Sequence, residues 1–219
     1  MTVKQQTAQK AVELLKQLYP NAKCSLKYNS SFQLLVAVRL SAQCTDARVN
    51  LVTPELFKQL PTAQIFKEAD VKTIENLIKS CGLYKTTAKD LKATAAIICD
   101  KYNGLVPDTI EELIKLPGIG RKTANLICGD IYGKPAVVTD THFIRISNRL
   151  GFVNSENPLI VEREMRKILP PDESNDFCHR IVLFGRDTCK AINPKCNDCI
   201  LNPICKKKIK KKAKSKGKK

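Results

Sequence analysis

Apolar residues recur at helical spacing along almost the whole chain. Val12, Leu15 and Leu18 show this spacing near the N-terminus, and Leu113 with Leu116 shows it again near the middle. No segment has the strict alternation of apolar and polar residues that a half-buried strand requires. The periodicity therefore predicts an all-α fold of about ten short helices.

Residues that begin and end helices support this prediction. Asp108 followed by Glu111 predicts a capping box, in which each side chain binds the other residue's backbone N–H. Gly82 and Gly104 each follow an apolar-periodic run, as C-terminal glycines of helices do. The Pro117-Gly118 pair predicts another helix end.

The bulk composition fits one or two globular domains. The chain has 219 residues, of which 43% are apolar and 27% charged. The first ten residues are polar and unlike a signal peptide, and no apolar run approaches the roughly 18 residues needed to span a bilayer. We therefore expect a cytoplasmic protein.

Basic residues outnumber acidic ones by 38 to 21, which gives a net charge of +17. Ten of the lysines lie in a tail from Lys206 to Lys219 that contains no acid, so the rest of the chain carries 17 − 10 = +7. A basic surface attracts polyanions, and nucleic acid is the leading partner, although many basic proteins bind nothing specific. The tail is expected to be disordered, either as a DNA-holding arm or as a solvated extension.

Six of the ten cysteines sit singly in apolar-rich segments. In a cytosolic protein they should stay reduced and act as small core residues. They are Cys24, Cys44, Cys81, Cys99, Cys128 and Cys178.

The other four, Cys189, Cys196, Cys199 and Cys205, form a C-x6-C-x2-C-x5-C run within seventeen residues. Four thiolates so close together indicate a metal centre, and their polar neighbours argue against a place in the core. Spacing alone favours an iron–sulfur cluster modestly over a tetrahedral zinc site.

The segment Leu116 to Lys122, Leu-Pro-Gly-Ile-Gly-Arg-Lys, lies between two helical patterns and predicts a helix-hairpin-helix motif. Gly118 and Gly120 permit positive φ and carry no side chain, so backbone N–H groups at the next helix start can approach a phosphate. For the Pro-Gly pair alone, a plain interhelical turn would be the better interpretation. The flanking Arg121 and Lys122 favour DNA binding.

Lys122 and Asp140 are eighteen residues apart, and each is expected at a helix start. The positive end of a helix dipole disfavours an ammonium group there, so Lys122 should be a better nucleophile. Asp140 has a competing role as an N-cap, which local sequence alone favours.

The hairpin segment, Val138 to His142 (Val-Thr-Asp-Thr-His) and the four-cysteine run occur in the order typical of endonuclease III. The chain resembles this family, within the helix-hairpin-helix DNA glycosylases, from about residue 10 to 205. The resemblance also includes Leu40 to Asp46 and Gly82 to Tyr84. Phe184 departs from the histidine of many relatives, and the Lys-rich tail is not part of the pattern.

The resemblance implies two helical domains with DNA bound between them. One would span 24–132, with the helix-hairpin-helix motif at about 108–130. The other would combine 1–23 with 133–205 and hold a 4Fe–4S cluster on the four cysteines. The expected DNA contacts are Gln43, Leu83, Gly118, Gly120, Arg121 and His142, where Gln43 and Leu83 fill the gap left by a flipped nucleotide. Helix packing is an alternative role for His142.

The implied activity is base excision repair by a bifunctional DNA glycosylase and AP lyase. Lys122 would displace an oxidised pyrimidine and form a Schiff base, Asp140 would assist, and β-elimination would cut the strand. The substrate would be double-stranded DNA carrying oxidised pyrimidines or abasic sites, and the protein would act as a monomer on chromosomal DNA. Adenine glycosylases lack the lysine, and a non-catalytic iron–sulfur module would need neither Lys122 nor Asp140.

Overall fold

The structure is a computed structural model that describes residues 1–207, so most of the Lys-rich tail lies outside the described residues. Within residues 1–207 every regular element is a helix, and the all-α prediction is confirmed. The chain divides into two compact units, one of residues 23–138 and one of residues 1–22 together with 139 onward. The sequence-based domain limits were 24–132 and 1–23 plus 133–205.

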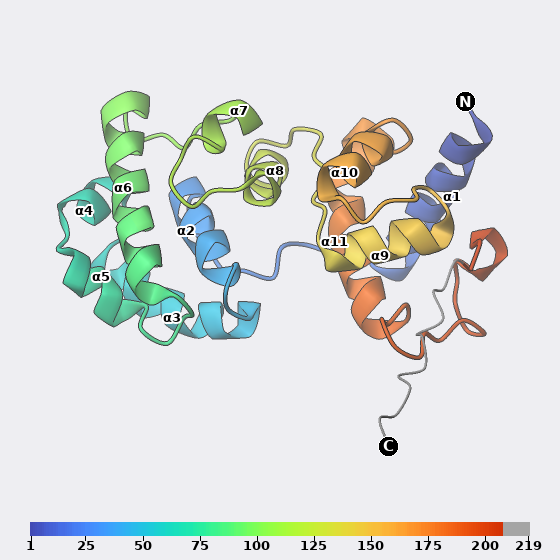
Figure 1. Cartoon of the computed structure of the whole chain (residues 1–219), viewed down its shortest axis with the longest axis horizontal. Coiled ribbons are helices and arrows are strands. Elements are labelled where there is room, and N and C mark those ends of the chain that lie inside the picture. Colours follow the sequence, from blue (N-terminus) through green and yellow to red (C-terminus); the bar gives the residue numbers. More distant parts are fainter. Residues whose placement is uncertain (208–219) are drawn as a thin grey trace, which may run out of the picture. The chain divides into compact units, whose positions relative to one another are not determined.

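The unit of residues 23–138 is built around α2, which contacts α3, α6 and α8. Four successive residues of α2, from Leu34 to Ala37, are completely buried, so this helix is apolar on all sides. The long helix α6 packs against α4 and α5 (Figure 1). The helices of this unit are α2 (Ser31–Ser41), α3 (Asp46–Gln59), α4 (Ala63–Glu68), α5 (Val71–Leu77), α6 (Tyr84–Tyr102), α7 (Ile110–Leu113) and α8 (Arg121–Asp130).

The other unit centres on α11, against which α1 and α9 both pack. Phe143 of α9 and Phe177 of α11 meet edge to face with ring centroids 6.2 Å apart. The elements of this unit are α1 (Val3–Leu18), α9 (Thr141–Leu150), α10 (Pro158–Arg166), the 3-10 turn η1 (Pro171–Glu173), α11 (Ser174–Asp187) and the 3-10 turn η2 (Asn202–Ile204).

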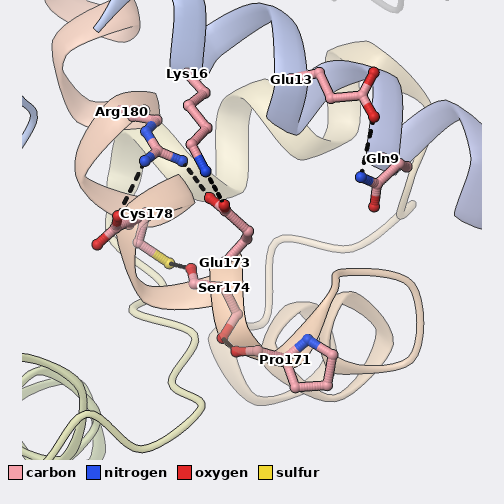
Figure 2. Close-up of polar contacts among 9 residues, drawn as sticks. Gln9, Glu13, Lys16, Pro171, Glu173, Ser174, Cys178 and Arg180 are labelled. Carbon is pink, nitrogen blue, oxygen red and sulfur yellow. Dashed lines mark hydrogen bonds and ion pairs between the residues drawn. The ribbon is translucent and has the colours of Figure 1, made fainter. Parts of the chain in front are cut away.

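A cluster of ion pairs joins α1 to the start of α11 (Figure 2). Arg180, whose side chain is 2% exposed, donates to Glu173 at 2.7 Å and to Asp176 at 3.0 Å. Lys16 of α1 pairs with the other oxygen of Glu173. The hydrogen bond from Lys16, and to a smaller extent that from Arg180, holds the pKa of Glu173 below its ordinary value. The N-terminal helix is thereby tied to a segment more than 150 residues away.

The predicted capping box at Asp108 and Glu111 is wrong by one residue. Thr109 is the N-cap of α7, and its hydroxyl accepts from the N–H of Glu112 at 3.3 Å. The carboxylate of Asp108 instead accepts from Lys134 Nζ at 2.6 Å. Asp and Thr are both good N-cap residues, so the sequence alone could not distinguish Asp108 from Thr109.

No cysteine in residues 1–207 forms a disulfide, and the six isolated cysteines differ in burial. Cys81, Cys128 and Cys178 are buried, whereas Cys24, Cys44 and Cys99 are half-buried. Burial raises the pKa of Cys24 to about 12.

Among the helices of residues 1–207, none combines the length and the apolar character needed to span a membrane.

Candidate active site

The helix-hairpin-helix motif consists of α7, a turn over residues 114–120 and α8. Leu116 and Ile119 are 2% and 5% exposed and anchor the turn in the core. Between them Gly118 has φ +71°, a conformation that favours glycine. The N–H of Ile119 donates to Leu116 O at 3.1 Å and closes the turn.

Gly120 does not adopt the positive φ that glycine permits. Its φ and ψ are −95° and 171°, which any residue can adopt, and it is the N-cap of α8. A Cβ at this position would meet no atom within 4 Å. Gly120 is therefore not required by the fold, and its missing side chain matters only for something that approaches from outside.

The start of α8 is open to an anion. No side chain caps this helix, because its N-cap is Gly120, which has no side-chain oxygen to accept from the first-turn N–H groups. Arg121 and Lys122 are its first two residues, and both are exposed. The amine of Lys122 has no hydrogen bond or ion pair within residues 23–138. Backbone donors and a cationic side chain therefore face solvent side by side.

Asp140 is the N-cap of α9, as the competing interpretation from sequence proposed. One carboxylate oxygen, Oδ1, accepts from the N–H of Phe143 at 2.7 Å. This bond fixes the direction of the carboxylate and leaves Oδ2 without a hydrogen bond among residues 139–207. Capping therefore uses only one of the two oxygens. Asp140 belongs to the unit that begins at residue 139, and Lys122 to the unit of residues 23–138.

His142 packs against α11, which was the alternative to a DNA contact. Its Nδ1 lies 3.1 Å from Arg145 Nη2. A Cβ at Gly185 of α11 would collide with the His142 ring, so this glycine makes room for the histidine. Burial lowers the pKa of His142, while the charge of nearby Asp140 opposes the shift. A contact between His142 and DNA stays a prediction.

Gln43 and Leu83 lie on two turns that touch. Gln43 is exposed between α2 and α3, and Leu83 is 63% exposed before α6. A Cβ on Gly82 would lie 2.8 Å from the Gln43 carbonyl oxygen, which shows how closely the turns approach. Leu83 has φ 52° and ψ 33°, a left-handed conformation that is costly for leucine. The structure thus holds an apolar side chain in solvent beside an amide.

The four clustered cysteines line one cavity in the segment after α11. Cys189 lies two residues after the end of α11, and its N–H donates to Phe184 O at 2.8 Å. The cavity is also lined by apolar side chains of α9 and α11 and by Leu201, which is 1% exposed. Its cysteine lining consists of Cys189, Cys196, Cys199 and Cys205.

The four cysteines line the cavity without converging on one point. Within residues 1–207 no three Cys, His, Asp or Glu side chains converge closely enough to hold a single metal ion. A tetrahedral zinc site would need all four sulfurs about 2.3 Å from one point. Burial, followed by the charges of neighbouring cysteines, raises the pKa of Cys199 and Cys205. A cationic group would therefore stabilise the thiolates.

Two arginines of α9 hold the cysteine segment, and sequence reasoning did not identify them. Arg149 donates to Cys189 Sγ at 3.3 Å and to Lys190 O at 2.7 Å. Arg145, four residues earlier, donates to Cys189 O at 3.0 Å. Their i, i+4 spacing places both arginines on one helix face, and this spacing was the feature of the sequence that could have identified them.

Comparisons with known proteins agree that this chain is similar to base excision repair proteins. Residues 36–171 match the family described as "HhH-GPD superfamily base excision DNA repair protein". Endonuclease III of Synechocystis sp. is 43% identical, with 94% of each chain covered. Endonuclease III of Escherichia coli K12 is 37% identical, with 92% of this chain and 97% of the relative covered.

A solved structure entitled "Structure of a non-covalent Endonuclease III-DNA Complex" has the same fold, with a TM-score of 0.86 and 42% identity. The match covers 94% of this chain and 97% of that one. The same values apply to "Structure of a Trapped Endonuclease III-DNA Covalent Intermediate: Estranged-Adenine Complex".

Proposed function

The chain belongs to the endonuclease III family of HhH-GPD superfamily base excision DNA repair proteins, and from that premise we propose that it excises oxidised pyrimidines through Lys122. Family membership makes it a DNA glycosylase with AP lyase activity. The observation that carries the proposal is the exposed Lys122 amine, which adjoins the uncapped start of α8.

The hairpin would bind the DNA backbone without reading sequence. Backbone N–H groups in the first turn of α8 would donate to a phosphate, helped by the helix dipole and by Arg121. Gly120 supports this role because no side chain stands at the N-cap to block the approach. A phosphate held there would place the neighbouring sugar near Lys122.

Excision requires that the damaged nucleotide leave the base stack. Leu83 and Gln43 are suited to fill the gap, since they are exposed on touching turns and Leu83 is held in a left-handed conformation. An apolar side chain already in solvent loses little when it enters the duplex. The amide of Gln43 could hydrogen-bond to the base opposite the gap.

Lys122 would then attack C1′ of the sugar with its amine. A C–N bond forms as the glycosidic bond breaks, and the base leaves with the bonding pair and takes up the proton that the amine loses. Cleavage of C1′–O4′ with protonation of O4′ then yields the Schiff base. Loss of a proton from C2′ and departure of the 3′ phosphate complete β-elimination. Asp140 would stabilise the positive charge that develops on the sugar, using the Oδ2 that capping leaves available.

Cys189, Cys196, Cys199 and Cys205 would hold a 4Fe–4S cluster, because all four line one apolar cavity. When bound, the cluster would supply a structural clip for residues 189–205 and take no part in the chemistry of Lys122. Arg149, which donates to Cys189 Sγ, would add a hydrogen bond to a coordinating thiolate.

Trapping with borohydride tests the role of Lys122. Duplex DNA with one thymine glycol or one abasic site is incubated with the protein and borohydride, and covalent complexes are separated by denaturing electrophoresis. We expect wild-type protein to be trapped, and Lys122→Gln to lose trapping and base removal while it still binds the lesion. Lys58→Gln, which removes an exposed lysine of α3, is the control for the charge change.

Each other result has a definite meaning. Trapping of Lys122→Gln at the wild-type yield would assign the nucleophile to another amine. Base removal by wild-type protein without any trapping would indicate a monofunctional glycosylase and would overturn the proposed Schiff base.

A further inference from the structure

An ion pair lies directly beneath the hairpin. Arg39 of α2 donates through Nη2 to Asp90 Oδ2 of α6 at 2.7 Å. The two side chains are 12% and 24% exposed, so the pair is largely shielded from water. Arg39 Nε is buried and has no hydrogen-bond partner in residues 1–207. A buried donor without a partner is uncommon and needs a structural reason.

Gly118 rests on this ion pair. A Cβ on Gly118 would lie 2.7 Å from Asp90 Oδ2, and Arg39 Nε would be closer still. The space that a side chain would need is therefore occupied by the two charged groups. One turn further along α6, Thr94 Oγ1 donates to Pro117 O at 3.1 Å. Pro117 is thus held by a hydrogen bond from α6, and Gly118 packs closely over side chains of α2 and α6.

We propose that Arg39 and Asp90 are positioning residues, which set the hairpin backbone and through it the α8 start that carries Lys122. This inference rests on the proposed function of the hairpin and Lys122. Only Ile119 and Gly120 separate Gly118 from α8, so a shift of the hairpin moves the first-turn N–H groups and the amine together. A displacement of about 1 Å can slow a positioned reaction by roughly 100-fold.

On this proposal, the shape of the Arg39 and Asp90 side chains positions the hairpin, and their charge does not. Replacement of a buried ion pair by apolar residues of similar size is often neutral or stabilising. The double variant Arg39→Met/Asp90→Leu should therefore fold as well as wild type but lose the flat polar surface under Gly118. Asp90→Asn keeps the shape and an oxygen that can accept from Arg39, so it should keep the hairpin in place.

The experiment measures three quantities on the full-length variants. They are the melting temperature, the affinity for an undamaged duplex, and the single-turnover rate of borohydride trapping on an abasic duplex at saturating protein. The matched control is Lys67→Met/Asp100→Leu, which removes the α4–α6 ion pair of the same unit.

We expect the Arg39/Asp90 double variant to keep its melting temperature and to lose about tenfold or more in trapping rate, with weaker duplex binding. Asp90→Asn and the Lys67/Asp100 variant should retain both activities. The positioning role is refuted if the double variant binds and reacts as wild type does. It is also refuted if Asp90→Asn loses as much trapping rate and duplex affinity as the double variant.

Failure of this inference differs from failure of the proposed function. Wild-type protein that is not trapped would remove the role of Lys122. Affinity for the undamaged duplex would still report on the hairpin, since it requires no chemistry. If the double variant does not fold, Arg39→Lys provides the test, because it keeps the charge but not the flat guanidinium under Gly118. Wild-type duplex affinity in that variant would overturn the proposal.

Discussion

Alanine at three glycines should separate backbone strain, steric conflict and ligand contact. Gly104 and Gly118 both have positive φ, +79° and +71°, but a Cβ on Gly104 meets nothing within 4 Å, whereas one on Gly118 meets Arg39 and Asp90. Gly120 has neither positive φ nor a neighbour within 4 Å. The three substitutions are chemically identical, so differences among them report the local structure.

The magnitudes follow from these environments. A left-handed alanine costs about 1–2 kcal/mol, and the less flexible unfolded chain returns about 0.4–1, so Gly104→Ala should lose roughly 0–1.6 kcal/mol. Gly118→Ala must also displace the ion pair, at an overpacking cost of about 1–3 kcal/mol, for a total of roughly 1–4.6 kcal/mol. Gly120→Ala loses a modest N-cap preference and gains the unfolded-state effect, so its stability should change by less than about 0.5 kcal/mol.

Chemical denaturation measures these free energies of unfolding, and fluorescence anisotropy with a labelled duplex measures binding. Gly120→Ala should fold as wild type does and bind DNA more weakly, because its methyl group stands where a phosphate approaches. If Gly118→Ala costs no more than Gly104→Ala, the conflict with Arg39 and Asp90 does not exist. Normal DNA affinity of Gly120→Ala would refute the assignment of the α8 start to phosphate binding.

Three further predictions concern the other unit. Asp140→Asn should keep its N-cap bond and melting temperature. It should lose base removal by orders of magnitude but still cleave a preformed abasic site, and equal loss on both substrates would contradict this. Asp140→Ala should in addition lose about 1 kcal/mol of stability. Cys196→Ala should abolish the brown colour and bound iron measured by absorption and metal analysis, and a colourless wild-type protein containing zinc would refute the cluster. Because Lys16 and Arg180 depress the pKa of Glu173, the contribution of Glu173 to the free energy of unfolding should be complete above its ordinary pKa of 4.5 and disappear as the pH falls through the depressed pKa. The free energy of unfolding of Glu173→Gln should therefore depend less on pH below 4.5, and an unchanged pH dependence would exclude this group.

Features that depend on short stretches of sequence could be predicted. Helical periodicity is local, so the all-α fold and the hairpin before α8 followed from it. The placement of Lys122 in a first turn and of Asp140 at a helix start was also local and agrees with the structure. The assignment of these two residues to catalysis comes from family resemblance and stays a proposal.

Features set by tertiary contacts could not be predicted. Arg39 and Asp90 are 51 residues apart, and nothing in either segment indicates their pairing. Asp108 pairs with Lys134, which is 26 residues away, and the sequence alone could not distinguish Asp108 from Thr109 as the N-cap. Gly120 shows a different difficulty, since the sequence cannot tell a glycine needed for its φ from one needed for its missing side chain.

The order of synthesis on the ribosome has a consequence for this chain. The unit of residues 23–138 is continuous and can fold as soon as it emerges. Helix α1 is made before this unit but packs on α11, and Lys16 pairs with Glu173, which is synthesised 157 residues later. Until then its apolar face, with Ala8, Ala11, Val12 and Leu15, has no native partner. A nascent chain stalled before residue 174 should therefore contain one folded unit and an N-terminal segment open to chaperones and proteases.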